Sequence, residues 1–212
     1  AKWLGEDKIY YEDTSKKKDP RDDKEILEGV WKLLDEADIV IAHNGDKFDI
    51  KKLNARFFAY NMPQPSKYRS IDTLKIAKRK FGFTSNKLSY LTSRFNDSEH
   101  QKSAHAKYPG FSLWKACLEG KKDAWKEMQE YNVMDVVSLE ELAKKLMPWD
   151  NSINWGLYLN EDTCSCGSTS LDPDGFYYTN ASKFVKYKCQ DCGAEFRSKK
   201  SLKTMVNTRP LR

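Results

Sequence analysis

The stretch Glu130-Tyr131-Asn132-Val133-Met134-Asp135-Val136-Val137 lies inside a longer run, residues 122–145, whose spacing predicts an amphipathic helix. The predicted apolar stripe, at steps of three and four residues, carries Met128, Leu139, Leu142 and Leu146. Tyr131 and Asp135 fall on the same stripe, one above the other. A carboxylate on an apolar face costs free energy unless it is paired or binds a cation. Asp135 is therefore either a cap or ion-pair partner, or a cation ligand.

Short apolar runs alternate with helical patterns before this helix. Ile39–Ala42 is wholly apolar, which is typical of a strand buried on both faces, and Arg69–Asp72 predicts a second strand. Further helices are predicted over 23–37, with a cap at Asp22 or Asp23, and over 48–60, 74–77 and 85–95. Residues 3–11 predict a hairpin, or the end of one strand and all of the next. The alternation favours an α/β layered domain over residues 1–150, with helices on both sides of its sheet.

Length and charge bound the remaining choices. The chain has 212 residues and a net charge of +6. No apolar run approaches the ~18 residues that a membrane span needs, and no signal peptide is visible, so we expect a cytoplasmic protein with no membrane partner. The tail, 198–212, is basic and without acids, which indicates either a polyanion partner or a solvated chain end.

A second candidate site follows the apolar strand at residues 39–42. His43-Asn44-Gly45-Asp46 forms the expected turn, and Asp49 lies in the first turn of the next helix. Ligand sites of α/β sheets gather where strands end and helices begin. Asp49 either stabilises the helix N-terminus or binds a ligand. Asp46 competes with it for the second role, but Phe48 is expected to give Asp49 an apolar wall.

These two stretches resemble known motifs. Asn44-x-x-x-Phe48-Asp49 resembles the second motif of DEDD-type (DnaQ-like) 3′–5′ exonucleases, and Tyr131-x-x-x-Asp135 resembles the third motif of their tyrosine (DEDDy) subclass. The strand and helix at Asp72-Thr73-Leu74 between them match in order. The segments 81–88 and 111–114 look like phage and bacterial predicted exonucleases of this ribonuclease H-like superfamily. The resemblance covers about residues 1–150.

The resemblance implies a mixed sheet flanked by helices and two Mg²⁺ or Mn²⁺ ions about 4 Å apart. Asp135 and Asp49 would be metal ligands, and Tyr131 would orient the attacking water. Asn44, Phe48 and Lys87 would contact the substrate, which we expect to be single-stranded DNA or a DNA 3′ end, with RNA open.

The family's first motif, Asp-x-Glu on the first strand, should lie before residues 3–11. Glu6-Asp7 and Glu12-Asp13 have the wrong spacing. Because the chain begins at Ala1 within strand-like sequence, we expect a partial chain that lacks its first strand and shows little nuclease activity alone. Two rivals stay open: a non-catalytic nucleic-acid-binding module with a degenerate site, and a structure-selective endonuclease of the same fold.

Four of the five cysteines form two close pairs, Cys164-Ser165-Cys166 and Cys189-Gln190-Asp191-Cys192. This spacing, with strand-like 176–178 and 184–188 between the pairs, resembles a Zn²⁺-binding zinc ribbon over residues 151–197. The alternative, two disulfides, needs an oxidising compartment. Aromatic residues interleaved with Lys183, Lys186 and Lys188 favour nucleic acid over a protein partner. Cys117 is expected to be a buried, inert thiol, and no role is assigned to His100 and His105.

Overall fold

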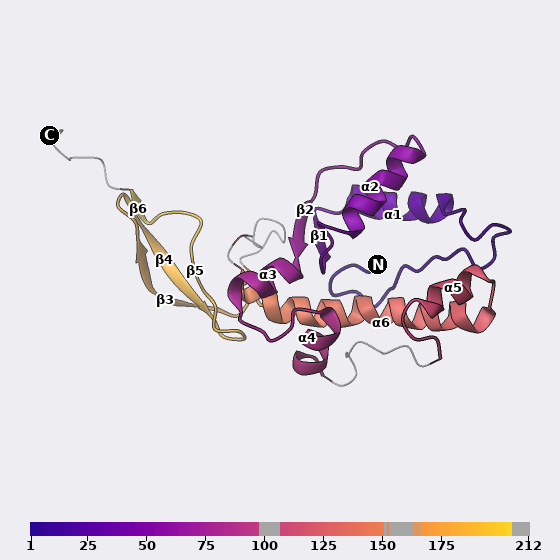
Figure 1. The fold of residues 1–212 in the computed structure, drawn as a ribbon. Helices are drawn as coiled ribbons and strands as arrows, with labels where there is room; N and C mark the ends of the chain where they lie inside the picture. Colours follow the sequence, from indigo (N-terminus) through magenta and orange to yellow (C-terminus); the bar gives the residue numbers. More distant parts are fainter. Residues whose placement is uncertain (98–106, 151, 153–162, 165, 205–212) are drawn as a thin grey trace. The chain divides into compact units, whose positions relative to one another are not determined.

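A computed structural model describes residues 1–97, 107–150, 152, 163–164 and 166–204 (Figure 1). The chain divides into two compact units, Ala1–Leu146 and Met147–Arg212. The division falls beside the short 3₁₀ helix η2 (Met147–Trp149), close to the end that we expect for the first domain. His100, His105, much of the linker after residue 152 and the end of the basic tail lie outside the described residues. Within the described part, no helix is both long and apolar enough to span a membrane.

The sheet of the first unit is a parallel pair, β1 (Ile39–Ala42) and β2 (Arg69–Asp72), which confirms both predicted strands. Ala42 pairs with Asp72, so both strands end at the same edge. A parallel pair needs a crossover, and α2 (Asp49–Ala59) lies in it. Among the described residues this sheet has two strands, so the mixed character implied by the resemblance does not appear in it.

The expected hairpin at residues 3–11 is reduced to a single antiparallel bridge between Lys2 and Ile9. Gly5 reverses the chain with a φ of +81°, a left-handed value that suits glycine. Glu140 of α6 (Lys122–Leu146) accepts hydrogen bonds from the Lys2 ammonium and from the Gly5 amide, the latter at 2.9 Å. The chain reversal at Gly5 is therefore held by hydrogen bonds to α6 and not by pairing with β1 or β2.

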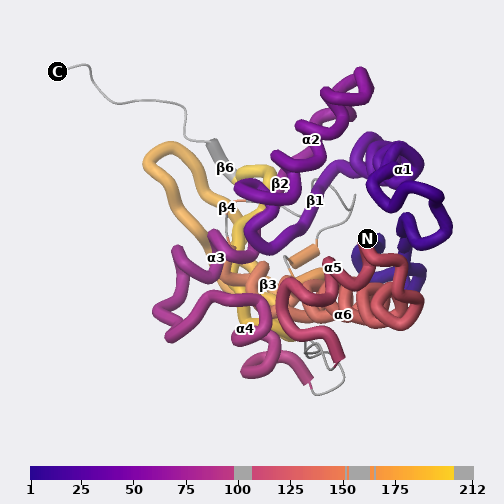
Figure 2. The backbone as a smooth tube through the Cα atoms, turned by 45° about the vertical axis from the view of Figure 1, so that its right-hand side comes forward, coloured from indigo at the N-terminus to yellow at the C-terminus, as the bar shows by residue number. Residues whose placement is uncertain are grey.

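Two apolar clusters hold the helices of this unit. The first joins α1 (Lys24–Glu36) and α2 to β1 through Leu27, Leu34 and Phe57, with Val40 packed against them. In both Figure 1 and Figure 2, α1 and α2 lie on one side of the strand pair and α6 lies on the other. The fold is therefore layered, with helices on both sides of the strands, as predicted.

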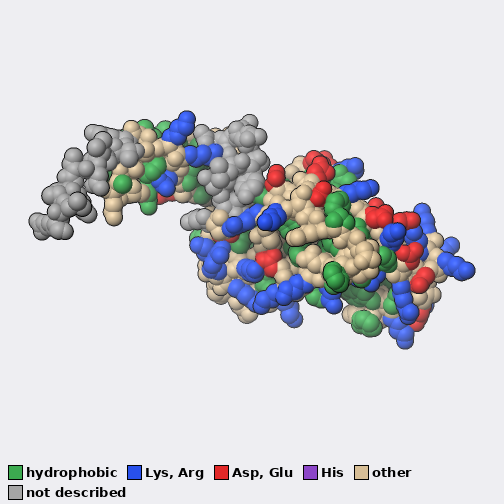
Figure 3. Space-filling view, turned by 90° about the horizontal axis from the view of Figure 1, so that it is seen from above, with side chains coloured by type: hydrophobic (Ala, Val, Ile, Leu, Met, Phe, Trp, Pro, Cys, Tyr) green, Lys and Arg blue, Asp and Glu red, His purple; other side chains and the backbone are tan. Residues whose placement is uncertain are grey.

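The second cluster joins α5 (Ser112–Leu118) to the start of α6. Its buried members are Leu113, Ala116, Cys117, Ala124 and Met128. The expected burial of Cys117 is confirmed, and burial together with the charge of Asp13 raises the pKa of this thiol. The remaining helices, α3 (Thr73–Lys80) and α4 (Leu88–Phe95), both contact α6. Figure 3 shows basic side chains gathered along one margin of this unit.

The second unit is a small antiparallel sheet. Its strands are β3 (Leu171–Tyr178), β4 (Ser182–Cys189), β5 (Glu195–Arg197) and β6 (Lys203–Thr204). β4 pairs with each of the others, and the two predicted strands are confirmed within β3 and β4. A bulge interrupts β3 between Pro173 and Phe176, where Gly175 has a φ of +82°.

Glu140 gives a stability prediction for the first unit. Burial alone would raise the pKa of Glu140, but hydrogen bonds from Lys2, Lys144 and Gly5 offset burial and hold it at about 2, below the ordinary 4.5. The carboxylate therefore stabilises the fold above pH 4.5, and this contribution fades as the pH falls from about 4.5 towards 2. We expect Glu140→Gln to lower the free energy of unfolding by about 2 kcal/mol at pH 7.

Urea unfolding of both proteins at pH 7 and at pH 3 measures this difference, which should shrink at the lower pH. Glu141→Gln is the matched control because Glu141 makes an ordinary i,i+4 ion pair with Lys145, worth about 0.5 kcal/mol or less. A Glu140→Gln difference that is the same at both pH values would contradict the assignment.

Candidate functional site

One face of α6 is buried almost throughout. Its positions, at steps of three and four residues, are Ala124, Met128, Tyr131, Asp135, Ser138, Leu142 and Leu146. All of these are at most 8% exposed except Tyr131 and Asp135, which are half-buried. Leu139 was expected on this buried stripe, and that prediction was wrong. Leu139 is only half-buried, and Ser138 occupies the buried position next to it. The stripe therefore opens to solvent at the two residues of the candidate motif.

Packing orients both residues of this opening. The Tyr131 ring meets the Trp114 ring edge to face, with 6.3 Å between the ring centroids and an interplanar angle of 74°. Trp114 belongs to α5, which buries the neighbouring Leu113 completely. The Oδ1 atom of Asp135 is buried although the residue is half-exposed. The site thus presents one aromatic hydroxyl and one carboxylate from adjacent turns of a single helix.

The turn after β1 is held by Asp72, which ends β2. Its Oδ1 atom accepts hydrogen bonds from the backbone N–H of Asn44 at 2.8 Å and of Leu74 at 3.0 Å. Asn44 has a φ of +66°, the left-handed region that asparagine tolerates. A Cβ atom on Gly45 would lie 2.4 Å from the Ala42 Cβ, so this turn requires glycine. Asp72 thereby fixes the approach to Asp49.

The two acids of this turn differ in electrostatics. Hydrogen bonds from Lys75 and Ser70 lower the pKa of Asp46. This carboxylate is therefore ionised, and the Lys75 ammonium already balances its negative charge. Burial of the carboxyl group and the charge of Asp72 raise the pKa of Asp49. The Asp49 side chain is exposed overall, but its carboxyl group lies next to Gly45 of the turn. A bound cation would relieve this repulsion, which favours Asp49 over Asp46 as a ligand.

The Phe48 side chain does not form the expected apolar wall. Its ring is 58% exposed, and the Lys52 ammonium lies 5.9 Å from the ring centroid. The partial burial of the Asp49 carboxyl group therefore comes from the turn itself. An exposed aromatic ring beside this acid is available to stack on a ligand.

His43 connects three segments. Its Nε2 atom lies 3.0 Å from the Asn86 carbonyl and its Nδ1 atom 2.9 Å from Thr73 Oγ1. Because a carbonyl only accepts, Nε2 carries a hydrogen. The Thr73 hydroxyl donates to the Ala42 carbonyl at 3.1 Å. These contacts tie the end of β1 to the start of α3 and to the segment before α4.

An open groove brings together Asn44 and Lys87, two of the expected substrate contacts. Its lining residues are His43, Asn44, Leu74, Lys78, Asn86, Lys87, Leu88 and Ser89. The Oδ1 atom of Asn86 is buried there and has no hydrogen-bond partner among the residues that the structure describes. Sequence reasoning gave no role to His43 or Asp72. The parallel pairing of the strands could have suggested both, because it places their carboxyl ends side by side.

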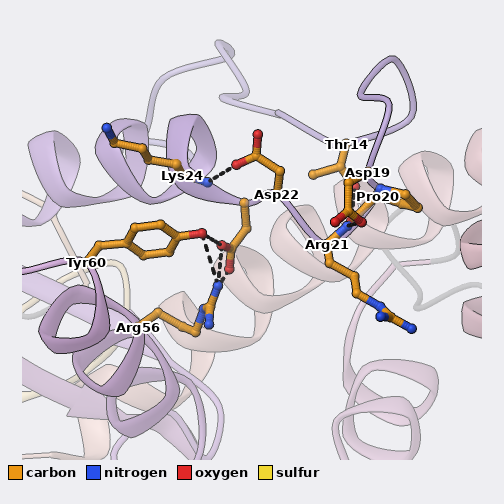
Figure 4. Close-up of polar contacts among 9 residues, drawn as sticks. Thr14, Asp19, Pro20, Arg21, Asp22, Lys24, Arg56 and Tyr60 are labelled. Carbon is orange, nitrogen blue, oxygen red and sulfur yellow. Dashed lines mark hydrogen bonds and ion pairs between the residues drawn. The ribbon is translucent and has the colours of Figure 1, made fainter.

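Other acids are engaged elsewhere. Asp23-Lys24-Glu25 has the Asp-x-Glu spacing, but Asp23 accepts hydrogen bonds from Arg56 and Tyr60, and Glu25 pairs with Lys17. In Figure 4 the side chains of Arg56 in α2 and of Tyr60, the residue that follows α2, converge on one carboxylate beside α1. Asp23 occupies the N-cap position of α1, but its side chain links α1 to α2 and does not cap the helix. Of the two predicted caps it is Asp22 that contacts the helix end, since its Oδ1 atom accepts a hydrogen bond from the backbone N–H of Lys24 at 3.4 Å.

In the described part of the chain, only the cysteine cluster brings three or more potential metal ligands close enough to share one ion. Neither Asp49 nor Asp135 belongs to such a group there. The acid pairs near the N-terminus do not supply one either. Glu6 and Asp7 line a separate pocket beside Glu140, and Asp13 accepts hydrogen bonds from Ser15.

The four cysteines of the second unit meet at one point. All four Sγ atoms lie within 4.8 Å of one another. The distance is 3.3 Å between Cys164 and Cys192 and 3.7 Å between Cys166 and Cys189. A tetrahedral Zn²⁺ with bonds of 2.3 Å separates its sulfurs by about 3.8 Å, so the cluster fits this ion. In the described part of the chain these sulfurs converge without a disulfide bond between them, which favours the metal over the disulfide alternative.

The electrostatics of the cluster suit a metal. Burial would raise the pKa of Cys189, but backbone N–H groups of Cys192 and Asp191 offset burial, and the pKa falls to about 7. Burial instead raises the pKa of Cys166 and Cys192. One thiolate is therefore favoured by the protein alone, and a divalent cation would stabilise the others.

Comparison with known proteins places the first unit in a family. The family described as "RNase_H superfamily" matches residues 3–147. Over 128 residues, 59% of the chain, the sequence is 30% identical to a protein named DNA polymerase III PolC-type from Ureaplasma parvum serovar 3, and the match spans 8% of that protein's length. No solved structure matches the chain. The family match covers well over half of the sequence, and the chain therefore belongs to the RNase H superfamily.

Proposed function

We propose that the first unit is a metal-dependent 3′–5′ exonuclease domain that hydrolyses phosphodiester bonds of DNA. Superfamily membership and similarity to a DNA polymerase support a nuclease hydrolase that acts on nucleic acid. One observation supports a 3′–5′ exonuclease in particular. The buried face of α6 becomes accessible to solvent at Tyr131 and Asp135. An apolar face interrupted by a phenol and a carboxylate serves packing poorly, but it provides an oriented hydroxyl and an anionic ligand.

Two acids of this unit fit a hard divalent cation. Mg²⁺ and Mn²⁺ prefer carboxylate oxygens, and Asp49 and Asp135 would hold such ions. When bound, two ions stabilise the attacking and leaving oxygens of a phosphodiester. The raised pKa of Asp49 supports this role, because a nearby cation lowers the free energy of its ionised form.

The remaining candidate residues would position water and substrate. The Tyr131 hydroxyl would orient the attacking water, with the ring held edge-on by Trp114. Asn44 and Lys87 share one groove, where the Lys87 ammonium would contact a phosphate. The exposed ring of Phe48 would stack on a terminal base.

A non-catalytic nucleic-acid-binding module is the second candidate. It is favoured by the arrangement of acids, because in the described residues neither Asp49 nor Asp135 belongs to a group of three or more potential metal ligands. Two-metal catalysis needs more ligands than these two side chains provide. A structure-selective endonuclease on the same fold would use the same residues, and its products would distinguish it.

The second unit would bind Zn²⁺ through its four cysteines and help to hold nucleic acid. The geometry of the sulfurs supports the metal. Basic and exposed aromatic residues on its strands support a nucleic acid as the partner. We therefore expect its affinity for nucleic acid to fall steeply with salt concentration.

Substitution of the candidate ligands tests the exonuclease. Asp135→Asn and Asp49→Asn should each lower the Mg²⁺-dependent release of mononucleotides by about 100-fold or more, because each removes a charge that stabilises the transition state. The assay follows a 5′-labelled single strand on a denaturing gel. Glu130→Gln, on the exposed side of the same helix, is the matched control and should retain activity.

The same experiment separates the alternatives. Stepwise shortening from the 3′ end supports an exonuclease, and internal cuts would indicate the endonuclease. Strand binding without any cleavage, unchanged by Asp135→Asn, would indicate the binding module. Equal losses for Asp46→Asn and Asp49→Asn would contradict the choice of Asp49 over Asp46.

Metal analysis tests the cysteine cluster. We expect one Zn²⁺ per chain, and Cys189→Ser should abolish stoichiometric binding and unfold the second unit, because this unit is too small to be stable without its metal. Elemental analysis and proteolysis of residues 163–204 report the two effects. Cys117→Ala is the control, since Cys117 packs in the α5–α6 cluster and should leave the zinc content unchanged. A metal-free protein stabilised by disulfides would refute the site.

A further inference from the structure

The sheet of the second unit has two chemically different faces. Cross-strand partners share a face, so the register assigns each side chain. The aromatic face carries Phe176, Tyr178, Lys183, Val185, Tyr187 and Phe196. The charged face carries Asp172, Asp174, Lys186, Lys188, Glu195 and Arg197, with Tyr177 and Phe184 among them.

The charged face is neutralised internally. All three acids of strands β3 to β5 lie on it, beside three basic residues. The Lys186 ammonium lies 2.7 Å from Asp174 and 3.5 Å from Glu195. The Arg197 guanidinium lies 3.8 Å from the centroid of the Phe184 ring. Little net charge remains on this face to attract a polyanion.

The aromatic face has the opposite character. Phe176 is 49% and Tyr178 is 64% exposed, and their rings meet edge to face with centroids 6.5 Å apart. The Lys183 ammonium lies 3.6 Å from the Phe176 centroid and 5.6 Å from the Tyr178 centroid. No strand residue of this face is acidic. The face therefore combines two open aromatic rings with a cation that no acid on the same face offsets.

We infer that the aromatic face is the surface on which this protein holds single-stranded nucleic acid. Bases would stack on Phe176 and Tyr178, and the Lys183 ammonium would contact the phosphate between them. Unpaired bases expose the flat apolar surfaces that such rings bind, whereas a duplex hides them. Charge complementarity favours this occupant over a neutral protein, because the face carries the Lys183 ammonium and no acidic strand residue. The inference rests on the proposed nucleic-acid function and assigns it a surface.

Paired substitutions on opposite faces of β3 test the assignment. The probe is a fluorescein-labelled oligothymidylate of twelve residues, titrated with the zinc-loaded full chain without Mg²⁺ and followed by anisotropy. Phe176→Ala and Tyr178→Ala should each weaken binding by about 5- to 100-fold. Tyr177→Ala is the matched control, because Tyr177 lies between them on the charged face and is equally exposed, at 48%. It should change affinity by less than about twofold.

Lysine substitutions add a second readout. Lys183→Gln should lower the slope of log affinity against log salt by about one, whereas Lys186→Gln should leave the slope unchanged. Zinc content and the far-UV spectrum of each variant verify folding, and Phe176→Leu keeps the apolar volume while losing the flat ring. Equal losses for Tyr177→Ala and Phe176→Ala would overturn the inference.

Other outcomes also decide between the proposals. Wild-type binding that the aromatic substitutions leave intact, or a preference for duplex over single strand, would also overturn the assignment, as would salt-insensitive capture of a protein by this face. Failure of the exonuclease proposal alone would give a different result: the protein would bind the oligonucleotide through Phe176 and Tyr178, yet it would release no mononucleotides when Mg²⁺ is added. Because the anisotropy assay contains no Mg²⁺, it is independent of catalysis.

Discussion

The carboxylate of Asp72 is the contact on which the candidate site of the first unit depends. One of its oxygens accepts hydrogen bonds from the amides of Asn44 and Leu74, so it joins the end of β1 to the start of α3. A pair of parallel strands has no tight turn to fix its ends, and such a bridge supplies the missing constraint. The left-handed Asn44 and the crowded Gly45 then direct the chain into α2, where Asp49 lies.

This constraint has an electrostatic consequence. Holding Asp72 beside the turn places a second negative charge near Asp49 and raises its pKa, whereas Asp46, three residues earlier, is neutralised by Lys75. Burial and like-charge repulsion both disfavour the ionised form of Asp49. A divalent cation reverses both effects at once. Asp49, whose negative charge is disfavoured in the folded protein, is therefore a better candidate metal ligand than Asp46.

Local periodicity was enough to predict β1, β2, α6 and the positions of Tyr131 and Asp135, because each depends on neighbours within a few residues. Two of the errors arose where partners lie far apart in the sequence. The side chain of Asp23, one of the two expected caps, accepts a hydrogen bond from Arg56, 33 residues away. The expected hairpin is a chain reversal anchored on Glu140, 135 residues from Gly5. The roles of Asp72 and His43 likewise depend on pairing between strands that no single segment reveals.

In the second unit, one inserted residue in β3 puts the acidic side chains and the exposed aromatic rings on opposite faces of the sheet. Asp172, Asp174, Phe176 and Tyr178 alternate along β3, and a regular strand would place all four on one face. The bulge at Asp174-Gly175 shifts the register by one residue, so that both acids face Lys186 and Lys188 while both rings face away from them. Gly175 permits this because it adopts a φ of +82° at little cost. Without the bulge the acids would lie beside the aromatic rings and repel a phosphate backbone, so the selectivity inferred for this face depends on backbone geometry as much as on composition.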